Sequence, residues 1–116
     1  MEKFLLLIRE DVEVLSKITE EERNECIREM TRWVEELVQT GNYSSGEPLL
    51  TMGRYVSKTN VLSDGPFIEA KEAISGYIII EAENLDQAAF IAQNCPRVLR
   101  EEMVIEVRPI LTVQND

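Results

Sequence analysis

The sequence predicts an α+β fold, a ferredoxin-like (split βαβ) protomer whose antiparallel sheet carries two helices on one face. Strand-length apolar runs and segments of helical periodicity follow one another in the order β-α-β-β-α-β. Two apolar runs offer side chains to both faces of a sheet, so a second sheet is expected to cover the face without helices. The chain has 116 residues, 44% of them hydrophobic, which fits a single domain over residues 1–116.

The first half of the chain predicts a strand followed by a long helix. The strand is KFLLLI at residues 3–8, and the helix spans residues 19–40. Thr19 and Glu22 have the spacing of a capping box, and Gly41 stands where a C-terminal cap is expected. The predicted buried stripe of the helix consists of Ile27, Met30, Val34 and Leu37, widened by Cys26, Trp33 and Val38.

Two irregular stretches follow this helix. GNYSSGEPL at residues 41–49 is rich in Gly, Ser and Pro and predicts a loop. GRYVSKTNVLS at residues 53–63 predicts a short hairpin that turns at residues 58–60.

The second half predicts two strands, at residues 76–82 and 104–110, with a helix between them. Asn84 and Gln87 form the expected cap of this helix, and Pro96 is expected to end it. Its predicted stripe consists of Leu85, Ala88, Ala89 and Ala92. Since FLLLI and YIII are apolar on both faces, we expect two subunits to pack sheet to sheet in a homodimer.

Composition excludes several classes of function. The chain has 22 acidic and 12 basic residues and a net charge of −10, which argues against nucleic acid and anionic membrane surfaces as partners. It has no histidine, so Ser-His-Asp and Cys-His triads are impossible within it. Cys26 and Cys95 lack a metal-ligand spacing and are expected to be buried thiols. We predict no metal and no cofactor.

The N-terminal segment MEKFLLLIRED is too short and too acidic to read as a secretory signal. No apolar run approaches the roughly 18 residues that span a bilayer. A cytoplasmic location is therefore expected.

Several short motifs, taken in order, resemble one known family. They are FLLLI, DGPF at residues 64–67, KE at 71–72, GY at 76–77, NCP at 94–96 and EVRP at 106–109. Together they resemble the DGPF branch of the YCII-related proteins over nearly the whole chain. The resemblance implies a ferredoxin-like protomer in a dimeric α/β barrel.

The resemblance implies less about function. Most members of the branch are uncharacterised, some are associated with extracytoplasmic-function sigma factors, and a few relatives in the superfamily process chlorinated aromatic-ring metabolites. The His-Asp pair proposed for some YCII-related proteins does not carry over, because the chain has no histidine. Ser75 stands where the family often has the first of two glycines, and Ala70 where a threonine or serine is usual.

The DGPF segment has two interpretations. In the structural one, Asp64 and Gly65 make a turn, Pro66 fixes the backbone and Phe67 fills the core. In the functional one, Gly65, Pro66 and Phe67 contribute to ligand binding, and their rigid turn holds the Asp64 carboxylate in a cleft between the first helix and the sheet. There it would act as a general base or bind a cationic or hydroxylated ligand.

Three further residues complete the candidate site. Lys71 would lie beside Asp64, and Glu47 would reach the cleft from the preceding loop. Arg54 is a candidate for two-point binding of a carboxylate, with a surface salt bridge as its alternative. Two functions stay open: a homodimeric protein or metal-free enzyme that binds a small polar or aromatic metabolite, and a non-catalytic interaction module with a basic protein partner.

Overall fold

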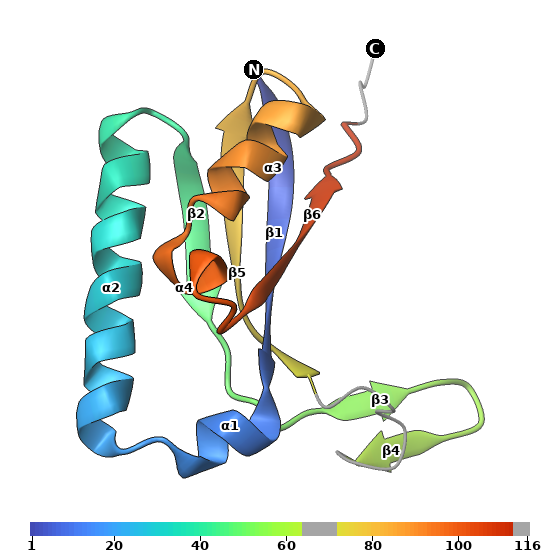
Figure 1. The fold of residues 1–116 in the computed structure, drawn as a ribbon. Coiled ribbons are helices and arrows are strands. Elements are labelled where there is room, and N and C mark those ends of the chain that lie inside the picture. Colours follow the sequence, from blue (N-terminus) through green and yellow to red (C-terminus); the bar gives the residue numbers. More distant parts are fainter. Residues whose placement is uncertain (64–71, 113–116) are drawn as a thin grey trace.

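A computed structural model describes residues 1–63 and 72–112. Its elements are β1 (Glu2–Asp11), α1 (Val12–Lys17), α2 (Glu20–Gln39), β2 (Tyr43–Pro48), β3 (Arg54–Val56), β4 (Val61–Ser63), β5 (Glu72–Ala82), α3 (Leu85–Gln93), α4 (Pro96–Leu99) and β6 (Val104–Pro109). A four-stranded antiparallel sheet has the order β2-β5-β1-β6, and α2, α3 and α4 lie on one face of it (Figure 1). The predicted α+β, ferredoxin-like class is confirmed.

The edge strand β2 shows that the predicted loop over residues 41–49 is wrong. Its backbone pairs with β5 from Tyr43 to Pro48. An edge strand needs hydrogen bonds on one side only, so Ser, Gly and a terminal Pro are tolerated there. The predicted hairpin is confirmed as β3 and β4, which form a separate two-stranded sheet.

Two short helices were not predicted. α1 begins at Val12 and is capped by Asp11, whose side chain accepts hydrogen bonds from two backbone N–H groups of the first turn. α3 ends at Gln93, ahead of Pro96 as expected, and Pro96 itself is the first residue of α4. The first residue of a helix has no intrahelical partner for its N–H, so the missing N–H of proline is tolerated there. The predicted caps at Thr19 and Asn84 are confirmed, because both side chains accept a backbone N–H. None of the helices in residues 1–63 and 72–112 is long and apolar enough to cross a membrane.

The core lies between the sheet and the helices, but α2 covers it unevenly. Trp33 and Leu37, in the C-terminal half of α2, are buried, whereas no residue N-terminal to them in this helix is. Ile27 and Val38, both expected in the buried stripe, are 56% exposed. The core cluster comprises Phe4, Leu6, Ile8, Trp33, Leu37, Ile78, Ile80, Ala82, Ala88, Ala92, Cys95 and Met103.

The face of the sheet opposite the helices, here called the open face, is half-buried in the single chain. Leu5 and Leu7 alternate with the buried residues of β1 and therefore point to this face, as does Ile79 of β5. The Arg9 side chain also lies on this face and forms an ion pair with Glu106 of β6, with 3.1 Å between Nη2 and Oε1. The open face thus combines aliphatic side chains with a partly exposed ion pair.

Gly46 of β2 provides a test of the β2–β5 pairing. A Cβ atom at this position would lie 2.8 Å from the backbone oxygen of Tyr77 and 3.1 Å from a side-chain carbon of Ile78. We expect Gly46→Ala to lower the free energy of unfolding by about 1–3 kcal/mol, measured by urea denaturation. Ser45→Ala, at an exposed position of the same strand, should change it by less than about 0.5 kcal/mol. Equal effects would contradict the close pairing.

Candidate functional site

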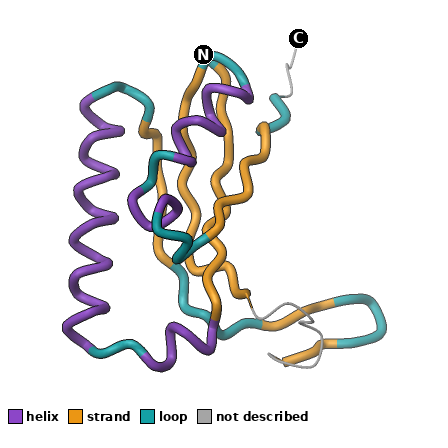
Figure 2. The backbone as a smooth tube through the Cα atoms, in the orientation of Figure 1, coloured by secondary structure: helices purple, strands orange, loops and turns teal. Residues whose placement is uncertain are grey.

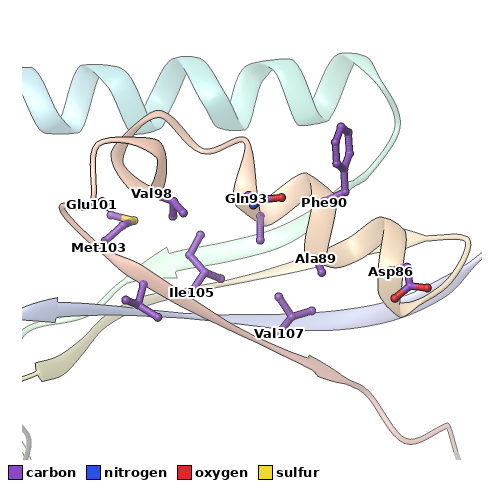
Figure 3. Close-up of a pocket in the computed structure, with 11 residues that line it drawn as sticks. Asp86, Ala89, Phe90, Gln93, Val98, Glu101, Met103, Ile105 and Val107 are labelled. Atoms are coloured by element: carbon purple, nitrogen blue, oxygen red, sulfur yellow. The ribbon is translucent and has the colours of Figure 1, made fainter.

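Two hollows lie on the helix side of the sheet. The first is a groove of about 730 Å³ between α3, α4 and β6 (Figure 3). Its walls are apolar, with Phe90 and Val107 among them, and its polar side chains are those of Asp86, Gln93 and Glu101. No arginine or lysine of the described residues lines this groove.

The second hollow is a cleft of about 570 Å³ beneath the N-terminal half of α2. The sheet forms its floor through β1, β2 and β5, and Leu15 and Ile18 close the end near α1. The buried residues of α2, Trp33 and Leu37, lie in its C-terminal half, so the N-terminal half forms the roof of the cleft. The apolar lining residues include Ile8, Met30, Val34, Pro48, Ile78 and Met103.

A buried ion pair lies in this cleft. Arg97 Nη2 is 2.6 Å from Glu10 Oε1, and the two side chains are only 10% and 9% exposed. Ser75 Oγ donates a hydrogen bond to Glu10 Oε2. The cleft therefore has aliphatic walls and one charged, hydrogen-bonded end.

The local geometry of two strands places Glu10 and Ser75 in the cleft. Glu10 continues the alternation of buried residues in β1, so it points toward the helices. The pairing of β1 with β5 shifts after Ile8, where Gly76 is opposite Ile8 and Ile74 is opposite Arg9. Ser75 is the extra residue of this irregularity, which aims its hydroxyl at Glu10.

The turn after α4 fixes Arg97. Glu101 has a left-handed backbone (φ 61°), and the N–H of Glu102 donates to the carbonyl of Arg97 at 2.8 Å. With the N–H of Glu101 donating to Val98, this is a Schellman motif, which reverses the chain at the end of the helix. The reversal brings the Glu102 carboxylate to 3.3 Å from Arg97 Nε.

Further ion pairs connect this turn to α2. Arg100 Nε lies 2.7 Å from Glu102, and its two terminal nitrogens donate to both oxygens of Glu29 at 2.7 and 2.9 Å. Charged groups thus run without a break from Glu10 in β1, through Arg97, to Glu29 in α2. This chain of contacts ties the roof of the cleft to its floor.

The surroundings of Arg97 and Glu102 favour the charged form of each side chain. Burial favours the neutral form of Arg97, but the Glu10 carboxylate, together with hydrogen bonds to Glu10 and Glu102, holds its pKa above the ordinary value. The hydrogen bond from Arg100 lowers the pKa of Glu102. Burial raises the pKa of the Cys95 thiol, so this cysteine stays protonated at neutral pH.

The structure describes two of the sequence-predicted site residues, Glu47 and Arg54, and only Glu47 lines the cleft. Glu47 borders the cleft, and its Oε2 lies 3.4 Å from the Tyr77 hydroxyl. Arg54 belongs to β3, donates to the carbonyl of Gly53 and does not line the cleft. The remaining predicted site residues lie outside the described part of the chain; they are Asp64, Gly65, Pro66, Phe67 and Lys71.

Sequence reasoning missed the three residues at the charged end of the cleft, Glu10, Ser75 and Arg97. Glu10 carried a signal, because it follows Phe4, Leu6 and Ile8 at every second position and so belongs to the core face of its strand. Arg97 carried none, because its position depends on a short helix and a turn that were not predicted. Ser75 was noted only as a departure from the family pattern.

The ion pair between Glu10 and Arg97 can be tested by removing one charge. Glu10→Gln keeps the shape of the side chain but leaves Arg97 buried with Glu102 as its remaining partner. We expect a loss of roughly 3 kcal/mol in the free energy of unfolding, measured in urea. Glu25→Gln breaks an exposed ion pair with Arg28 and should leave the free energy of unfolding nearly unchanged. Similar small losses in both variants would show that Arg97 is solvated.

Comparisons with known proteins agree with this architecture. The structure resembles 5-chloro-2-hydroxyhydroquinone dehydrochlorinase from Burkholderia phenoliruptrix AC1100, solved in complex with 2,5-dihydroxybenzoquinone. The TM-score is 0.57 at 17% identity, and the match covers 91% of this chain and 90% of the other. A search of curated proteins finds no match. The YCII-related domain matches residues 3–114, so the chain belongs to the family of proteins with this domain.

Proposed function

We propose that the protein binds a small hydroxylated aromatic or other small polar compound in the cleft beneath α2, as a binding protein or a metal-free enzyme. The observation that carries the proposal is the buried pair of Glu10 and Arg97 at the end of a 570 Å³ cleft with largely aliphatic walls. A cavity with apolar walls and a few convergent polar groups is the usual form of a small-molecule site.

The charged end has the chemistry to orient an oxygenated ring. Glu10 and Glu102 occupy Nη2 and Nε of Arg97, which leaves Nη1 to donate to a carbonyl, hydroxyl or carboxylate oxygen of a ligand. The Ser75 hydroxyl donates a hydrogen bond to Glu10 of this ion pair, and the Tyr43 side chain lines the same cleft. The aliphatic walls would then pack on the faces of the ring.

Energetics support a functional role for the charges. A buried ion pair loses the hydration of both ions, and an apolar pair of similar volume often stabilises a fold as well or better. Ionisable groups held in a cleft by such surroundings are typical of functional sites. The bound ligand of the similar dehydrochlorinase, a flat ring with oxygens on opposite sides, suits this combination of walls and polar end.

We further propose the sequence-predicted residues as a second part of this site. In this proposal the Asp64 carboxylate, held by the turn from Gly65 to Phe67 and flanked by Lys71, approaches the ligand from the rim near Glu47. Asp64 would serve as the base if the bound compound is turned over. A screen that finds no ligand would favour the alternative, a non-catalytic interaction module.

Filling the cleft tests the proposed ligand site. We expect wild-type protein to bind 2,5-dihydroxybenzoquinone in isothermal titration calorimetry and Cys26→Phe to lose binding at least tenfold, since position 26 lines the cleft. Val38→Phe, at an exposed position of the same helix outside the cleft, should bind like wild type. Equal binding by both variants would place the ligand elsewhere.

We also infer that two copies pair through their open faces as a homodimer. Leu5, Leu7 and Ile79 would become fully buried in that arrangement. Leu7→Glu places a charge at the centre of the face and should give a monomer of about half the wild-type mass in light scattering at micromolar concentration. Glu83→Gln, at an exposed position, should leave the dimer intact. A dimeric Leu7→Glu protein would contradict this interface.

A further inference from the structure

The β3–β4 hairpin and the segment leading into it, residues 49–63, form an arm that extends away from the body (Figures 1 and 2). Within residues 1–63 and 72–112, its two strands pair with each other and with no strand of the main sheet. The radius of gyration is 15.7 Å, whereas a compact chain of this length has a value of about 13 Å. A two-stranded hairpin alone is marginally stable in water, so packing against a further surface would stabilise the arm.

The arm exposes apolar side chains along its length. Leu50 and Met52 are 78% and 70% exposed, and Val56 and Val61, which are directly opposite each other across the hairpin, are 70% and 65% exposed. Apolar side chains gathered on one projecting element are characteristic of an interaction surface. Scattered exposed hydrophobic residues would need no such explanation.

The charge of the arm indicates which surface it meets. Residues 49–63 contain Arg54 and Lys58 and no acidic residue, although the whole chain carries a net charge of −10. The remainder of the chain is therefore strongly acidic. A basic, apolar arm is attracted to such a surface, and each copy of the chain carries one arm and one acidic body.

We propose that the arm docks on a second copy of this chain and reinforces the homodimer proposed above. The N-terminal end of the arm is attached to β5, because the N–H of Leu49 donates to the carbonyl of Ser75 at 2.9 Å. Leu49 and Thr51 also line the cleft. Docking of the arm would therefore hold one wall of the cleft in place, which links dimerisation to the ligand site.

The test compares dimer dissociation constants from sedimentation equilibrium. Val56→Ser/Val61→Ser removes the apolar pair of the arm, and we expect the dissociation constant to rise roughly tenfold or more. The matched control, Val38→Ser/Leu99→Ser, removes two apolar side chains that are 56% and 63% exposed on the helices and should leave the constant unchanged.

A second variant distinguishes loss of docking from local unfolding of the hairpin. Lys58→Glu lies in the turn, leaves both strands unaltered and reverses one basic charge. It should weaken the dimer by several-fold at low salt and by less at high salt. Weakening by either arm variant, with an unchanged control, supports the proposal.

Dissociation constants within twofold of wild type for both arm variants would overturn it, as would a wild-type protein that is monomeric at every concentration. Leu7→Glu distinguishes the open-face interface from the contact made by the arm. If Leu7→Glu dissociates the dimer and the arm variants do not, the open-face interface stands and the arm proposal alone fails.

Discussion

The ion pair between Glu10 and Arg97 is the interaction on which the candidate site depends. It joins the end of β1 to the start of α4, and both side chains are largely buried. Through the turn after α4, the same arginine is linked by further ion pairs to Glu29 in α2. This path spans from the floor of the cleft to its roof. A helix held partly by charge contacts at its side, and by core packing only near one end, leaves room beneath it.

That room is the physical basis of the proposed function. In a ferredoxin-like protomer the helices usually cover the sheet and fill the core between them. Here Trp33 and Leu37 fill the core under the C-terminal half of α2. No residue of the N-terminal half is buried, and a cleft lies beneath that half. The charged groups in the cleft lose hydration in the folded state, and a polar ligand would supply further partners for them. Stability alone would be served as well by an apolar pair.

Features of the fold that depend on neighbouring residues could be predicted from the sequence. The caps at Thr19 and Asn84, the turn of the hairpin and the apolar runs of β1 and β5 each rest on a few consecutive residues. β2 could not be predicted in this way, because its Ser- and Gly-rich segment becomes a strand by pairing with β5. The residues of the candidate site were harder to predict from the sequence than the strands and helices. Glu10, Ser75 and Arg97 are distant in sequence, and they meet only through the strand register and the turn that follows α4.

In the proposed function, a small oxygenated ring binds at the charged end of the cleft beneath α2. Mapping of backbone amide resonances during a titration with 2,5-dihydroxybenzoquinone tests it most directly, because every region of the chain reports separately. The account predicts the largest chemical-shift changes at Ser75, Gly76 and Arg97, with saturation at a single stoichiometry. Changes centred on Ala89, Gln93 and Ile105 would place the ligand in the groove beside α3 and contradict the claim, as would the absence of any saturable change.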